Sequence, residues 1–298
     1  MNTKWEHISV MKQESIDFLN IDPEKNYVDA TLGLGGHSKK IVDKLSTGKL
    51  ICIDTDEEAL TLAQKNLKEF DEKIIFCNDN FANIKNIIKE FNFESISGGI
   101  LADLGVSSME LDNSERGFSF LKNADLDMRM NRNQSLTAKY IVNNYSITDL
   151  INIFKIYGDE KFPGRIARAI CDRRRKKSIK ETLDLASIIK NSVPIKFQNT
   201  KIHPATKVFQ ALRIEVNDEL NVLKKFLLDS IDLLESKARL VIISFHSGED
   251  RIVKNVFRDK YLEGSVKLLT RKPLTPSEYE INENIRSRSA KMRILEKI

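Results

Sequence analysis

Cysteine and histidine are scarce in this 298-residue chain, which has three cysteines and four histidines. Cys52, Cys77 and Cys171 are far apart and form no C-x-x-C pair, and the histidines show no ligand spacing such as H-x-x-H. A disulfide framework and a zinc-type site are therefore not expected, and buried free thiols are the simplest interpretation. We predict that the protein binds no metal.

Long apolar runs are absent too. No stretch approaches the roughly 18 apolar residues of a membrane-spanning helix, and the first residues lack the apolar centre of a signal peptide. The apolar fraction of 41% still supports a substantial core, and the length suits one large domain or two smaller ones. We expect a cytoplasmic protein that does not act at a membrane, and we find no internal repeat.

The stretch Tyr27–Ser38, with the sequence YVDATLGLGGHS, organises the rest of the chain. It begins as a short apolar run, passes through Gly33, Gly35 and Gly36, and continues with apolar residues at helical spacing. Glycine lets the backbone turn tightly and leaves room for a ligand. A strand, a glycine turn and a helix start are typical of a nucleotide site, although a purely structural turn has the same pattern.

The acids around this turn distinguish between cofactors. Asp54 ends a second apolar run roughly 20 residues past the glycines, where such folds place a carboxylate for the ribose hydroxyls. Asp29, at the start of the turn, would repel the pyrophosphate of NAD, and the G-x-G-x-x-G spacing is missing. S-adenosylmethionine carries a cationic amino group, ribose hydroxyls and no phosphate. We therefore predict S-adenosylmethionine as the cofactor, with NAD as the alternative.

Apolar runs that alternate with helical patterns predict a parallel α/β sheet with helices on both faces. The predicted strands begin at Tyr27 and continue with 49–54, 73–77, 99–103 and 238–245, and an antiparallel hairpin pairs 266–269 with 292–295. Ligands bind at the carboxyl edge of such sheets. The acids expected at that edge are Asp29, Asp54, Asp79 and Asp103.

An insertion separates the fourth strand from the fifth. More than 130 residues lie between them, whereas a βαβ unit takes roughly 30. Residues 110–204 are predicted to form an inserted, mostly helical domain, with helices around 136–142, 147–156, 166–175 and 183–193. Residues 1–109 and 205–298 would then form the cofactor-binding domain, with the periodic stretch 209–234 as its returning crossover, interrupted near Asn217-Asp218.

The positive charge is unevenly distributed. The formal net charge is +5, but residues 155–180 alone contain ten bases and three acids. A run of five bases stands out there: Arg173, Arg174, Arg175, Lys176 and Lys177. A second basic cluster closes the chain: Arg286, Arg288, Lys291 and Arg293. The clusters favour a polyanionic partner such as nucleic acid, with a solvated charged face as the alternative.

The residue types also bear on the chemistry. Asp103 could accept a hydrogen bond from an exocyclic base amine, or could instead only cap a turn at the strand end. Methylation at a ring carbon would require an activated cysteine, and no cysteine stands at a predicted strand end facing the ligand edge. Phe81, His37 and His246 each have a structural alternative: a core ring, a solvent-facing helix cap and a strand-end histidine.

Seven blocks of sequence, in one order along the chain, carry a family resemblance: 29–38 (DATLGLGGHS), 103–108 (DLGVSS), 115–120 (ERGFSF), 126–130 (LDMRM), 203–213 (HPATKVFQALR), 244–247 (SFHS) and 286–291 (RSRSAK). These blocks resemble the bacterial 16S ribosomal RNA cytosine-N4 methyltransferases. The resemblance implies a class I methyltransferase fold with a helical insertion, S-adenosylmethionine as cofactor, and a cytidine of the decoding site of 16S rRNA as substrate.

Carried over by position, the family's cofactor contacts fall on Gly35, Gly36, His37, Asp54, Phe81, Asp103 and Glu110. Glu110 stands where the family usually has glutamine, and Gly248 where it commonly has leucine. The Asp/Asn/Ser-Pro-Pro-aromatic motif of other amino-methyltransferases is replaced by residues 103–106 (DLGV). Asp103 is the catalytic candidate, and the run 173–177 with His246 is the candidate RNA contact. A non-catalytic RNA-binding assembly factor is the alternative function, and a homodimer stays open.

Overall fold

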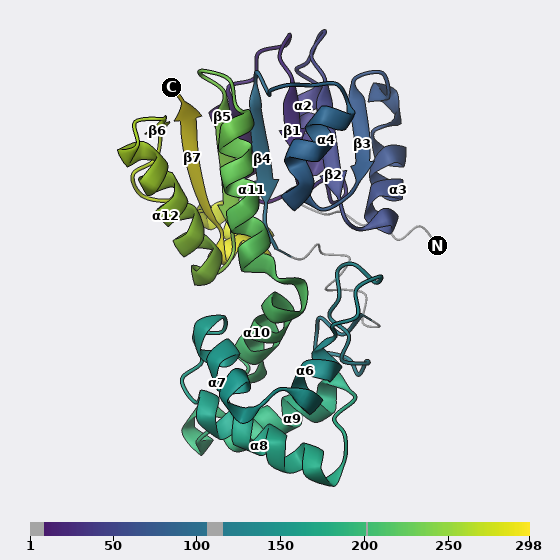
Figure 1. Cartoon of the computed structure of the whole chain (residues 1–298), viewed down its shortest axis with the longest axis vertical. Helices are drawn as coiled ribbons and strands as arrows, with labels where there is room; N and C mark the ends of the chain where they lie inside the picture. Colours follow the sequence, from purple (N-terminus) through teal and green to yellow (C-terminus); the bar gives the residue numbers. More distant parts are fainter. Residues whose placement is uncertain (1–8, 106–115, 201) are drawn as a thin grey trace. The chain divides into compact units, whose positions relative to one another are not determined.

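The structure, a computed structural model, describes residues 9–105, 116–200 and 202–298. It divides into two compact units (Figure 1). The first unit contains the described residues up to Gly105 and those from Leu220 onward, and the second contains the described residues from Arg116 to Glu219. No helix in the described part of the chain is long and apolar enough to cross a membrane.

The first unit is built on one sheet with the strand order β3-β2-β1-β4-β5-β7-β6. Its strands are β1 (Tyr27–Asp29), β2 (Leu50–Asp54), β3 (Ile74–Asn78), β4 (Gly99–Asp103), β5 (Arg239–Ser244), β6 (Val266–Leu268) and β7 (Lys291–Lys297). The strands β1 to β5 are parallel, and β7 runs antiparallel to both β5 and β6. The predicted class I fold, including the antiparallel hairpin, is confirmed.

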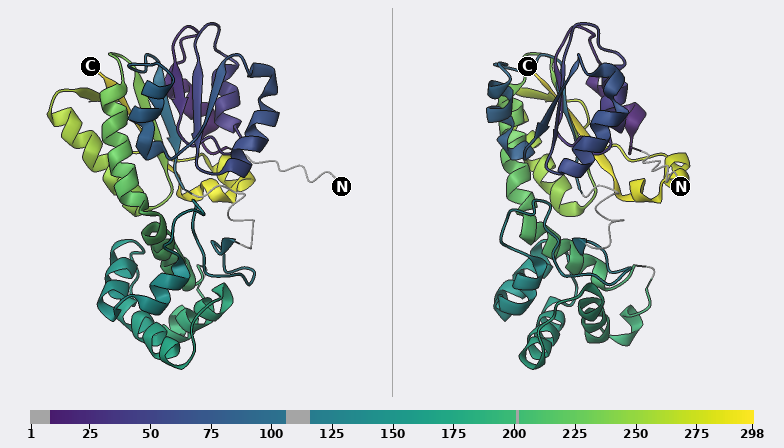
Figure 2. Two further views of the ribbon diagram at one scale, coloured as in Figure 1. Left: turned by 45° about the vertical axis from the view of Figure 1, so that its right-hand side comes forward. Right: turned by 90° about the vertical axis from the view of Figure 1, so that its right-hand side faces the viewer.

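Helices cover both faces of this sheet because successive strand side chains point to opposite faces. Val28, Ile51 and Ile100 pack in a core with α4 (Ile84–Glu90), α11 (Glu219–Leu233) and α12 (Ser247–Leu262). Tyr27, Leu50 and Leu101 pack in a second core with the helices on the other face, which Figure 2 shows from two sides. Those helices are α1 (Lys12–Leu19), α2 (Gly36–Val42) and α3 (Glu57–Asn66).

Short helical segments complete the first unit. They are η1 (Lys68–Phe70), η2 (Phe81–Asn83), α13 (Glu278–Glu283) and η5 (Ile285–Ser289). The segment η2 follows β3, whereas α13 and η5 directly precede β7. The last two therefore lie where β7 begins, which is the edge of the sheet where the parallel strands end.

The second unit is helical and has a core of its own. The helices that the structure describes there are α6 (Ala138–Asn144), α7 (Ile147–Ile156), α8 (Pro163–Lys176), α9 (Thr182–Ser192), η4 (Ile195–Phe197) and α10 (Ala205–Asn217). Residues 205–219 are predicted from the sequence to belong to the first unit. The structure instead buries Phe209 and Leu212 of α10 in the helical core. The break between α10 and α11 falls at Asp218, which has a left-handed φ of 49°.

Candidate active site

The candidate site lies at the carboxyl edge of the sheet, where β1 has β2 on one side and β4 on the other. The strand order reverses at β1, and ligands of open α/β sheets bind at such a switch point. Asp29, Asp54 and Asp103 are the last residues of β1, β2 and β4. The parallel registers bring these three predicted acids to one edge.

The glycine turn joins β1 to α2 at this edge. Gly33 and Gly35 have φ values of 51° and 82°, which L-residues rarely adopt. A Cβ on Gly35 would lie 2.9 Å from Leu67 Cδ1, and a Cβ on Gly36 would clash with Ser9 Oγ. By contrast, nothing lies within 4 Å of a Cβ built on Gly33. Leu67 and Ser9 thus leave little room for side chains at Gly35 and Gly36, while Gly33 borders open space.

Asp54 ties this turn to β2. Its Oδ2 accepts a hydrogen bond from the Gly33 N–H at 2.8 Å, and its Oδ1 accepts from the Asp56 N–H at 2.9 Å. Burial raises the pKa of Asp54, and the two backbone N–H groups partly offset that shift. An ionised carboxylate offers about four acceptor positions, so Asp54 keeps acceptor capacity for further donors.

Asp29 lies behind the turn. Its side chain is 1% exposed, and its two oxygens accept hydrogen bonds from Ser38 Oγ at 2.6 Å and from the Thr31 N–H at 3.2 Å. Burial raises the pKa of Asp29 to about 6. This geometry indicates that Asp29 stabilises the turn and does not contact a cofactor directly. Its predicted effect on the cationic group of the cofactor would therefore act through its charge.

Asp103 is the acid with an unused acceptor. Its backbone N–H donates to Thr31 Oγ1 at 2.6 Å, which fixes the end of β4 against the turn. Its Oδ1 is buried and has no hydrogen-bond partner among the residues that the structure describes. Burial raises the pKa of Asp103 well above its usual value, and the charges of Asp29, Glu249 and Glu280 raise it further. A donor or a cation brought to this oxygen would satisfy it and restore the ionised form.

His37 faces the same acid from the start of α2. It is 5% exposed, so the alternative of a solvent-facing cap is wrong. Its Nε2 lies 3.0 Å from the Val10 carbonyl oxygen, and its Nδ1 lies 3.9 Å from Asp103 Oδ2. Donation from Nε2 to Val10 assigns the proton of a neutral ring to Nε2 and leaves an acceptor at Nδ1. At 3.9 Å the contact with Asp103 is longer than a hydrogen bond, so the geometry places His37 beside the end of β4.

Phe81 has a structural role at the neighbouring strand. It begins η2 after β3 and is half-buried. Its ring meets Phe226 of α11 nearly edge-on, with centroids 4.8 Å apart. One side of the Phe81 ring therefore packs in the core, as the structural interpretation predicted. The ring is also partly exposed, and its contact with the cofactor stays a prediction.

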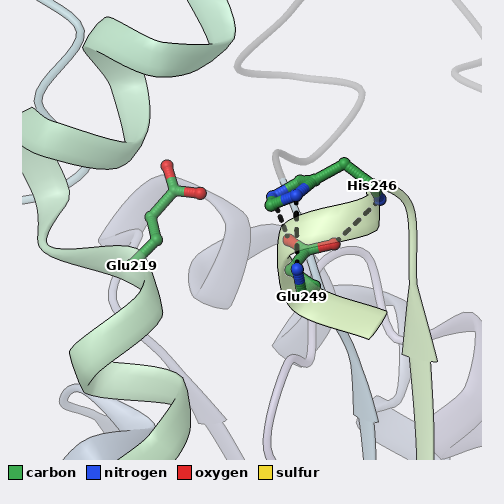
Figure 3. A group of neighbouring side chains, drawn as sticks. All are labelled: Glu219, His246 and Glu249. Atoms are coloured by element: carbon green, nitrogen blue, oxygen red, sulfur yellow. Dashed lines mark hydrogen bonds and ion pairs between the residues drawn. The ribbon is translucent and has the colours of Figure 1, made fainter. Parts of the chain in front are cut away.

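His246 caps helix α12, as Figure 3 shows. Its Nδ1 accepts hydrogen bonds from the Gly248 and Glu249 N–H groups at 3.2 and 3.3 Å. Glu249 returns the interaction, because its Oε2 accepts from the Phe245 N–H at 2.8 Å and the His246 N–H at 3.2 Å. His246 Nε2 lies 3.1 Å from Glu249 Oε1 without the alignment of a hydrogen bond. His246 thus has the structural role that was the alternative to a substrate contact.

Replacing His246 with alanine should therefore destabilise the protein by about 1 kcal/mol, the typical effect of a lost N-cap. The measurement is urea unfolding of both proteins, and His246→Asn is the matched control because asparagine is a good cap. Equal stability of the alanine variant and the wild type would contradict the capping role. A loss of activity in a fully stable asparagine variant would instead support the predicted substrate contact.

The five-base run in the second unit splits into two groups. Arg174 donates to the Val142 and Tyr145 carbonyl oxygens at 2.9 and 2.7 Å, near the end of α6. Arg173 donates to Asp184 at 3.1 Å. These two side chains stabilise the helical unit itself. Arg175, Lys176 and Lys177 are exposed, and Arg175 pairs with Asp172 at 3.2 Å on the surface.

Several residues important to this geometry were not identified from the sequence. Thr31 and Ser38 lie in the stretch Tyr27–Ser38, but their contacts cross the turn and have no periodic signal. Glu249 is 3% exposed, and its position three residues after the cap is the signal of a capping box. Glu110, the predicted cofactor contact with an atypical side chain, lies outside the described residues.

Comparison with known proteins decides the family. The model of the MraW methylase family matches residues 4–298. The chain belongs to the MraW methylase family. The resemblance found in the sequence blocks is thereby confirmed, and so are the predicted methyltransferase activity and S-adenosylmethionine as cofactor. The alternatives of an NAD-dependent oxidoreductase and of a non-catalytic assembly factor do not fit a methylase.

Curated relatives match this methylase over its whole length. "Ribosomal RNA small subunit methyltransferase H" of Finegoldia magna is 46% identical over 311 residues, which cover 99% of both chains. The protein of the same name from Clostridium botulinum strain 657 is also 46% identical, over 99% of this chain and 100% of its own. Among solved structures, an rRNA methylase from Streptococcus thermophilus aligns over 98% of this chain and 99% of its own, with a TM-score of 0.46 and 14% identity.

Proposed function

We propose that this methylase transfers a methyl group to N4 of a cytidine in the decoding region of 16S rRNA, in the small ribosomal subunit and in the cytoplasm. The observation that carries the proposal is Asp103, a carboxylate at the switch point whose buried Oδ1 has no partner in the described part of the chain. The names of the full-length relatives point to RNA of the small subunit as the substrate.

The residues at the edge fit S-adenosylmethionine, which supplies an activated methyl group. The negative charge that Asp29, Glu249 and Glu280 place around Asp103 suits its cationic amino group. Asp54 has acceptor capacity for its ribose hydroxyls, and the open side of Gly33 leaves space beside that carboxylate. We assign the remaining contacts, on the family pattern, to Gly35, Gly36, His37, Phe81 and Glu110.

The cysteines support methylation at nitrogen over methylation at a ring carbon. Attack at carbon needs a thiolate close to the substrate. Cys52 is fully buried in β2, and burial raises its pKa well above the usual value. Burial likewise raises the pKa of Cys77 to about 11, and Cys171 lies in the core of the helical unit. None of the three cysteines is suited to attack the ring carbon of a base bound beside Asp103.

For an exocyclic amine, Asp103 offers an acceptor. The lone pair of the amine is delocalised into the base ring, so a hydrogen bond that favours a pyramidal nitrogen makes it a better nucleophile. The unpaired Oδ1 can accept that hydrogen bond, and the positions of reacting groups supply much of the remaining rate. Transfer of the methyl group would break its bond to sulfur and leave S-adenosylhomocysteine, and the cationic nitrogen would then release one proton to water.

The decisive experiment asks whether the purified protein methylates 16S rRNA from cells that lack this protein. Small-subunit particles from the deficient cells are incubated with labelled S-adenosylmethionine and the purified protein, and the RNA is digested to nucleosides for mass spectrometry. We expect labelled N4-methylcytidine from one position in the decoding region. Labelled 5-methylcytidine would overturn the proposed chemistry, and unlabelled RNA would overturn the proposed substrate.

The second unit would bind RNA through the exposed part of its basic run. Changing Arg175, Lys176 and Lys177 to glutamine should weaken RNA binding and reduce its salt dependence, by about 0.7–0.9 in the log–log slope for each phosphate that is no longer bound. The control is a variant with three exposed lysines of the first unit changed to glutamine: Lys65, Lys68 and Lys89. Cofactor affinity should not change in either. Equal salt slopes for the two variants would indicate that residues 175–177 are a solvated charged surface that does not bind RNA.

A further inference from the structure

The second basic cluster of the sequence also separates into two parts. Lys291 and Arg293 of β7 both bind Asp250 of α12, at 3.2 and 2.7 Å, and Arg293 is 8% exposed. Arg293 is buried in the first unit and Lys291 is partly exposed, and both lower the pKa of Asp250. Arg288 of η5 is exposed, and its guanidinium forms no hydrogen bond or ion pair with any part of the chain that the structure describes.

Arg251 is a second exposed guanidinium near the same ion pairs. It follows Asp250 in the first turns of α12, and within residues 9–105, 116–200 and 202–298 its guanidinium has no hydrogen bond or ion pair. Arg288 is three residues before Lys291, the partner of Asp250. The ion pairs of Asp250 therefore join the start of α12, which carries Arg251, to the segment η5–β7, which carries Arg288.

Both arginines lie at the edge of the sheet that carries Asp103. In the register of β5 with β7, Ser244 at the end of β5 pairs with Lys291 at the start of β7. Helix α12 begins three residues after β5 ends, and η5 ends two residues before β7 begins. In Figure 2 the yellow segments that precede β7 lie at the end of the sheet where β4 and β5 end.

The charge at this edge explains why cations are needed there. Asp103 is surrounded by the charges of Asp29, Glu249 and Glu280, which all raise its pKa. Such an acidic centre suits a cationic group but repels phosphate. A nucleotide that reaches Asp103 within an RNA strand brings its neighbouring phosphates to the same edge. Binding of the strand therefore requires cations around the acidic centre.

We propose that Arg251 and Arg288 bind the phosphate backbone of the RNA strand beside the target nucleotide. The planar guanidinium matches phosphate geometry and can donate two parallel hydrogen bonds. Phosphate contacts of this kind position a strand without reading its bases. The inference rests on the proposed function, because it takes an RNA strand as the ligand of this edge.

The test is a double variant, Arg251→Gln with Arg288→Gln, compared with a charge-matched control, Lys237→Gln with Lys267→Gln. Lys237 lies two residues before the start of β5, and Lys267 pairs with Glu296 near the end of β7, so both exposed lysines lie at the opposite edge of the sheet. Binding of a short single-stranded ribo-oligonucleotide is measured over a series of salt concentrations. Methyl transfer to small-subunit particles is measured in parallel.

We expect the arginine variant to lose about 1.4 in the log–log salt slope of RNA binding, from about 0.7 for each single-strand phosphate bound. Its KM for the particles should rise roughly tenfold or more, while kcat and the affinity for S-adenosylmethionine stay near the wild type. The lysine control should resemble the wild type in all four quantities. Identical salt slopes and KM values in the two variants would overturn the inference.

Failure of the proposed function would give a different result. In that case the wild-type protein itself would leave the particles unmethylated. The salt slope for the oligonucleotide would still decide the role of the two arginines. A changed slope supports the phosphate contact, and an unchanged slope overturns it.

Discussion

Replacing Asp103 with asparagine is expected to lower single-turnover methyl transfer by roughly 10²-fold or more, the scale on which a positioned polar group contributes to a rate. Asparagine has the shape of aspartate but not its charge, and its amide can present a donor where the substrate amine needs an acceptor. The assay uses saturating S-adenosylmethionine and small-subunit particles, so that a loss of cofactor affinity does not enter the rate.

The same substitution should leave the ligand-free fold intact. The folded-state pKa of Asp103 lies well above its ordinary value, so the contribution of this group to stability is present at acid pH and lost as the pH rises through that pKa. Asparagine does not ionise. We expect the variant to unfold at the same or a higher temperature near neutral pH, with a weaker pH dependence.

A comparison with Asp79 separates the hydrogen bond from the general charge of the edge. Asp79 follows β3, and its Oδ1 already accepts from the Asn80 N–H at 2.6 Å and Asn83 Nδ2 at 2.9 Å. An equal loss of turnover in Asp79→Asn would assign the effect to charge at the edge. Near-normal turnover in Asp103→Asn would contradict the catalytic role of Asp103. Methylation at N4 would then still be tested by identifying the product nucleoside.

The positions of the edge acids could be predicted because parallel strands follow local rules. An apolar run that ends in an acid places that acid at the carboxyl edge wherever the strands are parallel. Asp54 and Asp103 are found there for this reason. The direction of each carboxylate was not predictable. Asp29 is at the same edge, yet its oxygens bind Ser38 and Thr31 behind the turn.

The basic clusters show the same limit. Charge counts identified residues 173–177 and 286–293, but exposure depends on partners that are distant in sequence. Arg174 binds carbonyl oxygens 32 and 29 residues away, and Arg293 binds Asp250, 43 residues away. Such pairings set which arginines are structural, and no local pattern in the sequence records them.

The C-terminal boundary of the helical unit could not be predicted for a related reason. Helical periodicity runs from α10 into α11 on both sides of Asp218. Phe209 packs in the core of the helical unit, and Leu223 and Leu227 pack in the core against the sheet. Periodicity shows that a helix has a buried face, but it does not show which core buries that face.

Replacing Asp54 with alanine should weaken the binding of S-adenosylmethionine by roughly 1.5–3 kcal/mol for each charge-assisted hydrogen bond to the ribose that is removed. At about 1.4 kcal/mol per tenfold change, each bond corresponds to a loss of roughly ten- to a hundredfold in affinity. Isothermal titration of the wild type and the variant gives both dissociation constants. Unchanged affinity in a folded variant would contradict the role of Asp54.

The geometry of Asp54 requires one further comparison. The alanine variant also removes the acceptor of the Gly33 and Asp56 N–H groups, so a displaced turn could weaken binding without any ribose contact. A double-mutant cycle separates the two effects, because coupling appears only between groups that interact. S-adenosylhomocysteine and its analogue without the ribose hydroxyls are titrated into both proteins. If Asp54 binds the hydroxyls, the wild type favours the hydroxylated ligand and the variant loses that preference; an equal preference in both proteins would assign the effect to the turn.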